Sequence, residues 1–566
     1  MKIIKFLIIW TAIIATAQVI CHNITYSVVV HDMKNADMGV IIDEIPTPFM
    51  LGVSEETPYI FTGVAPSALK GYRYTKINSS KIYDTETFSR FPTKENTLNE
   101  FYGRSTNIHP IPAYPQLFEP LASIHRINTD IHQDGQIPTF FLYGNEAGVR
   151  EMHSNVFLKT KIELNLTYIG LNYVQSIVRI NIKLAGRSTK MTPKGSYKIN
   201  LGKGNELFGF QKIKLRSLVT DPSYLREKLS NDLIKSFGLA GSGFSYARVF
   251  INDKPYGLFG VQEDLENPWI VNEFNDGSQD YTQGTLYAGN HNASLSPITD
   301  IASLDIKEGD VFHQPQYQIK EVSSRNGEKA PSDFQQLISL TEFLAMTPIP
   351  KSISAWNQKI DIDSVLRSLA LEVIVGNNDG YIASQTNYFL FSNLKQSGQF
   401  IFIPSDMDFT FGSGFKRYCN DTIQGKYENF PYFDVTLPLL RILEVPDFKL
   451  TFGELIKKAV SNVNIIYSRI DALAEMIKED VIWDQSITRD YIILPNINTV
   501  NSSLTFIVEN EHMDPVVFSD YLGRVLHNNI SFEEAINGTI KRPSIMGLKQ
   551  WITASADAYL KDQLLR

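Results

Sequence analysis

Phe402 to Gly412 read FIPSDMDFTFG, and this stretch places two carboxylates at the end of an apolar strand. The run FIFIP, which leads into it, is typical of a buried strand. Asp406 and Asp408 follow, separated by one residue. Because a strand end holds the side chains that follow it in place, the stretch indicates a site built on carboxylate oxygens.

The chain before this stretch adds two more oxygen-bearing side chains. The segment VIVGNNDGYIASQTNYFLF carries Asp379 after a helical pattern and Asn387 at the start of a strand. NYFLFSN and QFIFIPS are expected to pair across KQSG, which would bring these side chains to Asp406 and Asp408. Carboxylates and a carboxamide oxygen suit Mg²⁺, and one further carboxylate can accept a proton from an attacking hydroxyl. The alternative is that the four residues only cap turns.

An apolar strand ending in D-x-D-x-T is also the signature of haloacid-dehalogenase phosphatases. In that interpretation Asp406 is the nucleophile and Asp408 the acid/base of a covalent carboxylate mechanism. The signature normally opens its domain and is followed by a lysine and a second acidic pair. Here it lies late in the chain with no convincing acidic pair after it, so this hypothesis ranks third.

A basic segment upstream is suited to phosphate groups. LAGRSTKMTPKGSYKINL, which spans 184–201, combines Gly186 and Ser188 with several cations, among them Lys194. A turn of this composition between two strands can fold over phosphates through backbone N–H groups and lysine charge. It is not a Walker A loop, and the alternative is a solvated hairpin tip. Arg216 in IKLRS is a further candidate cation.

The composition is that of a globular chain. Of 566 residues, 43% are hydrophobic and 20% are charged, and the net charge is −8. At roughly 100–200 residues per domain, the length allows two to four domains. The mild negative charge argues against a protein that coats nucleic acid. Neither H-E-x-x-H nor G-x-S-x-G occurs, which disfavours a metalloprotease or a serine hydrolase.

Residues 1–17 are predicted to be a secretory signal peptide. Lys2 and Lys5 flank the start of the short apolar run Phe6–Ile14, and Ala15–Ala17 form an A-x-A cleavage site. No other apolar stretch reaches about 18 residues, and the charged end AYLKDQLLR offers no GPI tail. We therefore expect a secreted or cell-surface protein without a stable membrane span.

Two further features bear on the secretory route. Cys21 and Cys419 either form one bridge or remain two thiols, and they are too few for a disulfide framework or a cysteine metal site. N-x-S/T sequons are compatible with secretion, and eight occur, at Asn23, Asn78, Asn165, Asn292, Asn420, Asn501, Asn529 and Asn537.

The order of patterns predicts an α+β protein. Residues 18–95 have alternating, Pro- and Gly-punctuated strands and are expected to form a β-sandwich. Residues 96–134 are rich in Pro and polar residues and indicate a linker or strap. Residues 135–480 begin with strands and continue with helices that carry the inserted strand pair. Residues 481–566 are expected to be a C-terminal helical extension.

Five motifs, taken in order, resemble the CotH family of spore-coat-protein-H-like atypical protein kinases, whose fungal members include invasin-like surface proteins. They are GRSTKMTPKGSYKINL, KIKLRSLVTDPSYLREKL, FINDKPYGLFGVQEDLE, NNDGYIASQTNYFLF and FIPSDMDFTFG. The resemblance covers roughly residues 135–480. It implies a divergent kinase-like bilobal domain, a strand-rich lobe followed by a helix-rich lobe, that uses ATP with Mg²⁺ or Mn²⁺.

The resemblance also implies roles for the oxygen-bearing residues. Asp379 matches the catalytic-loop aspartate, which orients the substrate hydroxyl. Asn387 matches a metal-side asparagine. Asp406 matches the metal aspartate, with Asp408 as its partner.

A nucleotide-binding set follows in the same way. Lys194 matches the lysine that pairs with the ATP phosphates, and Glu263 matches an acidic residue near the adenine. Gly186, Ser188 and Arg216 complete the predicted set.

The sequence departs from the family pattern where phosphates would be gripped. The family's arginine falls at Ala185, its second basic residue at Gly195, and its tryptophan at Ser405. Two functions therefore remain open beside the phosphatase. One is a secreted kinase that phosphorylates Ser or Thr of a secretory, spore or cell-wall protein. The other is an adhesin that binds a host-cell or wall protein and has a silent kinase site.

Overall fold

The structure is a computed structural model, which describes residues 22–31, 37–154, 156, 158–186, 190, 192–299, 304, 315–325, 328–330, 333–396, 398–433, 437–489, 492, 513–527 and 529–564. The predicted signal peptide, Cys21 and Ser188 lie outside these residues. The chain divides into two compact units, residues 1–107 and 108–566.

The first unit is one curled sheet. Its seven strands lie in the order β6-β5-β2-β3-β4-β1-β7. They are β1 (Asn23–Val29), β2 (Asp37–Ile42), β3 (Phe49–Val53), β4 (Ile60–Pro66), β5 (Tyr72–Asn78), β6 (Lys81–Thr85) and β7 (Glu100–Phe101). The predicted sandwich is wrong, because β2 pairs with both β3 and β5 and so joins all the strands. Tyr26, Val40 and Tyr74 are fully buried in one shared core.

The second unit begins with a closed barrel. Its strand order is β10-β11-β12-β14-β13-β8-β9, and only β8 and β13 run parallel. The strands are β8 (Thr139–Gly144), β9 (Lys161–Ile169), β10 (Val174–Ala185), β11 (Ser196–Asn200), β12 (Lys212–Arg216), β13 (Ser245–Ile251) and β14 (Lys254–Glu263). Strands β13 and β14 form an antiparallel hairpin, with Ile251 opposite Lys254. Helix α1 (Glu146–Ser154) packs against the barrel, where a His153 ring nitrogen lies 2.9 Å from the Tyr197 hydroxyl.

Alternation along β12 sets the two faces of this barrel wall. Ile213 and Leu215 are fully buried in the barrel core. Lys212, Lys214 and Arg216 therefore project from the outer face. Lys198 of β11 lies opposite Lys214 in the register and shares that face. The outer face of this wall is consequently rich in cations.

A four-stranded antiparallel sheet follows in the order β16-β15-β19-β20. Its strands are β15 (Leu286–Gly289), β16 (Tyr317–Glu321), β19 (Tyr388–Asn393) and β20 (Gln399–Pro404), and β17 (Ser324–Arg325) and β18 (Glu328–Lys329) form a separate pair. The predicted pairing of β19 with β20 is confirmed, with Tyr388 opposite Pro404. All six residues of β20 are buried, as its apolar run predicts.

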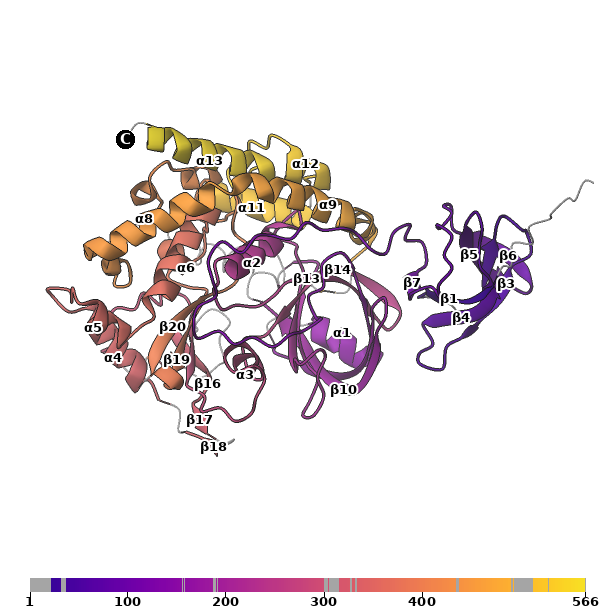
Figure 1. The fold of residues 1–566 in the computed structure, drawn as a ribbon, viewed down its shortest axis with the longest axis horizontal. Coiled ribbons are helices and arrows are strands. Elements are labelled where there is room, and N and C mark those ends of the chain that lie inside the picture. The colour runs from indigo at the N-terminus through magenta and orange to yellow at the C-terminus, as the bar shows by residue number, and fades with distance from the viewer. Residues whose placement is uncertain are drawn as a thin grey trace, which may run out of the picture. The chain divides into compact units, whose positions relative to one another are not determined.

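Helices complete the second unit (Figure 1). They are α2 (Arg226–Ser236), α3 (Trp269–Phe274), α4 (Gln335–Leu344), α5 (Ile353–Asn357), α6 (Ile362–Val375), α7 (Tyr381–Ser384), α8 (Pro446–Val460), α9 (Val463–Ser486), α11 (Pro515–His527), α12 (Phe532–Asn537) and α13 (Leu548–Leu564). Helix α6 contacts both α8 and β20. It ends at Gly376, which has the left-handed conformation that glycine favours at a helix C-terminus. Among the described helices, none is long and apolar enough to cross a membrane.

The segment before the barrel is fixed to the second unit. The backbone N–H groups of Leu117 and Phe118 donate to the carbonyl of Ser236 at the end of α2. Leu117 and Leu121 are buried in the main core. Residues 108–138 therefore form an ordered strap of the second unit.

Candidate active site

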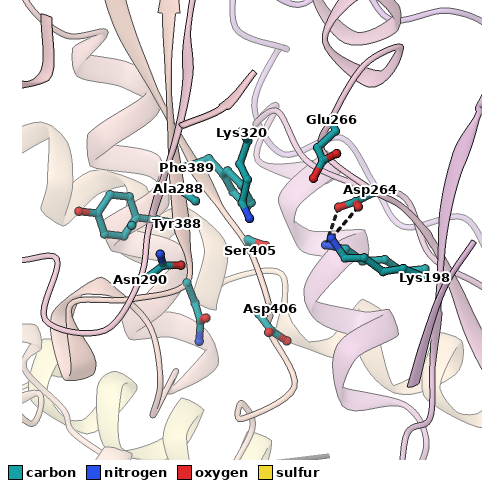
Figure 2. A pocket seen from close by; sticks show the side chains of 13 residues that line it. Lys198, Asp264, Glu266, Ala288, Asn290, Lys320, Tyr388, Phe389, Ser405 and Asp406 are labelled. Carbon is teal, nitrogen blue, oxygen red and sulfur yellow. Dashed lines mark hydrogen bonds and ion pairs between the residues drawn. The ribbon is translucent and has the colours of Figure 1, made fainter. Parts of the chain in front are cut away.

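A pocket of about 140 Å³ opens between the cationic barrel wall and the four-stranded sheet. Figure 2 shows Lys320 of β16 and the Lys198–Asp264 pair directed toward it from two sides, with Asp406 at its edge. Its lining is strongly polar and comprises Lys198, Lys214, Asp264, Glu266, Ala288, Gly289, Asn290, Lys320, Asn387, Tyr388, Phe389, Ser405 and Asp406. The pocket thus brings three lysines together with Asn387 and Asp406 of the predicted set, whereas Asp379 and Asp408 do not line it.

Three lysines supply the positive charge. Lys198 Nζ lies 2.7 Å from Asp264 Oδ2, and Lys214 Nζ lies 3.1 Å from Asp264 Oδ1. Burial lowers the pKa of Lys320 to about 8, and the neighbouring Lys198 contributes to this shift. Lys320 donates to the neutral Gln318 at 2.6 Å. One aspartate is therefore shared by two lysines, and the third lysine pairs with an amide oxygen, so an anionic ligand would be stabilised here.

Arg216 organises an acidic corner beside the pocket. Its Nη2 lies 2.5 Å from Asp406 Oδ1 and 3.7 Å from Asp408 Oδ2, and its Nε lies 2.9 Å from Glu227 Oε1. Burial opposes the charge of Arg216, but these carboxylates outweigh it and raise the pKa of Arg216 well above its ordinary value. Thr220 donates to Asp408 at 3.0 Å.

The acidic corner carries more negative charge than Arg216 compensates. Burial raises the pKa of Asp408 well above its ordinary value, and the charge of Asp406 adds to the shift. Burial likewise raises the pKa of Glu227. A second cation near Asp406 and Asp408 would therefore be favourable.

Asp379 is held by Asn387 and Lys416 and does not itself line the pocket. Asn387 Nδ2 donates to Asp379 Oδ2 at 2.9 Å and to its carbonyl at 2.8 Å. The buried Lys416 lies 3.7 Å from Asp379 Oδ1 and donates to Ser384 at 3.0 Å. Asp379 and Asn387 are thus fixed to each other, and Asn387 shares the pocket lining with Asp406.

The backbone turns sharply just before β19 begins and just after β20 ends. Asn387 and Asp406 have φ of 58° and 55°, a left-handed conformation that Asn and Asp tolerate better than most residues. The N–H of Ser405 donates to the carbonyl of Asn387 at 3.0 Å, which joins the two strand ends. This local geometry accounts for Asn and Asp at these positions.

The predicted oxygen ligands fit a divalent cation by their chemistry. Asp406 and Asn387 present carboxylate and carboxamide oxygens to one pocket. Burial and the charge of Asp406 raise the pKa of Asp408, and a cation beside the two carboxylates would favour their ionised forms. Within the described residues there is no preformed cluster of three or more His, Cys, Asp or Glu ligands. Phosphate oxygens and water would have to complete the coordination, as is usual for Mg²⁺.

Two predicted nucleotide-binding residues lie elsewhere. Lys194 is buried, with its Nζ 2.7 Å from Asp484 Oδ1 and 2.5 Å from the Leu258 carbonyl. Glu263 accepts from the Gly243 N–H at 2.7 Å and lies 3.0 Å from a His132 ring nitrogen. Neither residue lines the pocket.

Of the other predicted nucleotide-binding residues, one lies at the acidic corner and the others do not line the pocket. Arg216 contacts the acidic corner directly. Gly186 follows the end of β10, is exposed with φ of 86° and does not line the pocket. Ser188 lies outside the described residues.

Lys198 belongs to the basic segment 184–201 that the sequence assigns to phosphate groups, whereas Lys214 and Lys320 were not predicted. Lys214 had a detectable signal, since it alternates with buried apolar residues along its strand. Lys320 had none, because its approach depends on how β16 packs beside β15.

Comparison with known proteins identifies the family. The sequence model of the family described as CotH kinase protein matches residues 182–514, more than half of the chain. The chain belongs to the CotH kinase family. It is 26% identical over 450 residues to the invasin CotH3 of Rhizopus delemar, and the aligned region covers 76% of this chain and 71% of that relative. It is 24% identical over 356 residues to the inner spore coat protein H of Bacillus subtilis, and the aligned region covers 62% of this chain and 89% of that relative.

Proposed function

We propose that this protein is a secreted or surface-exposed kinase that transfers the γ-phosphoryl group of ATP to a Ser or Thr hydroxyl of another protein. The observation that carries the proposal is one pocket lined by three lysines together with Asn387 and Asp406, with Asp379 hydrogen-bonded to Asn387. Phosphoryl transfer depends chiefly on positioning and charge stabilisation, and this pocket offers both.

The lysines and the oxygen-bearing residues have distinct tasks in this proposal. Lys198, Lys214 and Lys320 hold the phosphates by charge, in place of the Lys194 role that the resemblance implies. Asp406 and Asn387 would hold Mg²⁺ or Mn²⁺, which supplies neutralisation of phosphate charge when bound. Asp379, held by Asn387, orients the acceptor hydroxyl and accepts its proton.

Transfer of labelled phosphate tests the proposal. Secreted protein is incubated with labelled ATP, Mg²⁺ or Mn²⁺ and a generic acceptor protein, beside the Asp379→Ala and Asp406→Ala variants. Asp471→Ala is the matched control, because its side chain is 61% exposed and pairs only with Lys549 in the described structure. We expect label with the wild type and the control, and none with the two site variants. Label that persists in both site variants would contradict the proposal.

A second candidate is an adhesin with a silent site. The 2.5 Å pair of Arg216 with Asp406 favours it, since this pair occupies the proposed metal ligand. Invasins among the relatives make a host-cell or wall protein a reasonable partner. Binding of a protein partner that is unchanged by Asp406→Ala, together with no ATP-dependent thermal stabilisation, would support this candidate. The family match removes the ground for a dehalogenase-type phosphatase.

A further inference from the structure

Sequon asparagines occupy the surface of both units. Seven of the eight fall on described residues, namely Asn23, Asn78, Asn165, Asn292, Asn420, Asn529 and Asn537, and all seven side chains are in the exposed class. Asn501 lies outside the described residues. The spread over strands, loops and helix ends shows that no single element accounts for the exposure.

Other asparagines of this chain behave differently. Of the 22 non-sequon asparagines whose burial is described, seven are exposed. Five are fully buried, at Asn231, Asn272, Asn377, Asn378 and Asn393. Asparagine alone therefore does not predict exposure here, whereas asparagine followed by x-Ser or x-Thr does. An attached glycan is bulky and hydrophilic, so a glycosylated asparagine must reach solvent in the folded protein.

The local contacts leave the acceptor nitrogen usable. Asn165 accepts the Arg179 N–H at 3.0 Å, and Asn529 accepts from Arg542 at 2.7 Å, in both cases through the side-chain oxygen. Asn537 donates from Nδ2 to Glu533 at 2.7 Å. An N-linked glycan leaves the oxygen and one N–H in place, so all three bonds can persist.

The proposed kinase site contains none of these residues. Asn290 and Asn387 line the pocket, and neither is in a sequon. Glycans at the seven positions would therefore leave the pocket residues themselves unmodified.

We propose that the seven exposed sequon asparagines are N-glycan acceptors. In each, Nδ2 attacks the anomeric carbon of a lipid-pyrophosphate-linked oligosaccharide. The N-glycosidic bond forms, the bond from that carbon to the pyrophosphate oxygen breaks, the lipid pyrophosphate leaves, and the amide loses one proton. This inference is independent of phosphoryl transfer and requires only passage through a secretory compartment that carries out this chemistry.

The full chain, secreted from a eukaryotic host, is treated with peptide-N-glycosidase in heavy-oxygen water. The enzyme converts each glycosylated asparagine into aspartate with a mass label, which peptide mass spectrometry assigns to a residue. We expect labels at the seven positions and none at Asn172 and Asn205, which are exposed but lack a sequon. Labels at two or fewer of the seven, or equal labelling of the control asparagines, would overturn the proposal.

A sequon variant separates glycan loss from misfolding. Thr167 completes the Asn165 sequon, so Thr167→Ala removes the signal and Thr167→Ser keeps it. We expect one mobility step to disappear in Thr167→Ala and to remain in Thr167→Ser, with both proteins secreted. Identical mobility of the two variants would show that Asn165 carries no glycan and would count against the proposal.

Discussion

Replacing Arg216 by Gln removes the only cation that touches the acidic corner in the described structure. Side chains of Glu227 and Asp408 are 4% and 10% exposed, whereas that of Asp406 is 43% exposed. Removing one partner of a buried ion pair costs about 3–5 kcal/mol, and exposed pairs contribute little. Because Asp406 reaches water and Asp408 can take up a proton, we expect the low end, about 3 kcal/mol of unfolding free energy at neutral pH.

The penalty depends on pH with a defined sign. Arg216 lowers the pKa of both Glu227 and Asp408, so its removal raises both values further. A carboxyl whose folded-state pKa is raised loses stability as pH rises through that value. The deficit of Arg216→Gln relative to wild type should therefore shrink as the pH falls from 7 toward the unfolded-state values of 4.5 and 3.8.

Urea unfolding followed by tryptophan fluorescence measures this effect. The signal reports the second unit, where the described tryptophans lie, at Trp269, Trp356, Trp483 and Trp551. Lys254→Gln is the control, since its ion pair with Glu146 is 65% and 40% exposed and should contribute less than about 1 kcal/mol. A loss below about 1 kcal/mol for Arg216→Gln, or a loss that does not change with pH, would refute this account of the corner.

Three further outcomes follow from the same contacts. ATP affinity should fall between pH 7 and 9 in the wild type, because Lys320 has a pKa of about 8 and loses its charge, and calorimetry should show a flatter profile for Lys320→Gln. Arg524→Gln should raise the metal concentration needed for half-maximal phosphate transfer several-fold, because Arg524 donates to the carbonyl of Thr220, whose hydroxyl contacts Asp408. The control Arg542→Gln should leave this concentration unchanged, because Arg542 pairs with Asp520 instead. Lys194→Met should lower the urea midpoint while the folded protein keeps its ATP affinity, and a lost affinity would restore the phosphate-binding role of Lys194.

Short-range patterns predicted much of the second unit. Strands β19 and β20 were predictable because a continuous apolar run bounded by turn residues indicates a buried pair, and Asn387 and Asp406 lie where that pair ends. The end of α6 was predictable because Gly376 supports a left-handed C-terminus. By contrast, α2 begins at Arg226 although Asp221 and Pro222 resemble a helix start. The Asp221 carboxylate instead accepts the Arg226 N–H at 2.8 Å.

Long-range pairing was beyond the sequence. The alternation in residues 18–95 fits a sandwich and a curled sheet equally, and only the pairing of β2 on both sides decides between them. The same holds for Lys194, which is polar, close to the basic turn and therefore a reasonable phosphate ligand. Its actual partner is Asp484, 290 positions away on α9. Neither spacing nor composition identifies such a contact.

The acidic corner also depends on chain beyond the family-matched residues 182–514. The N–H of Gly414 donates to the Ser544 carbonyl at 3.0 Å, and the N–H of Met546 donates to the Gly412 carbonyl at 2.8 Å. Gly412 has φ of 75° and lies against Trp551, where an added Cβ would approach the indole to 2.6 Å. The loop after Asp408 is therefore held by the C-terminal segment as well as by β20. Because a carboxylate that binds a metal must be held in place by its neighbours, the proposed metal site depends on the C-terminal segment that carries Ser544, Met546 and Trp551.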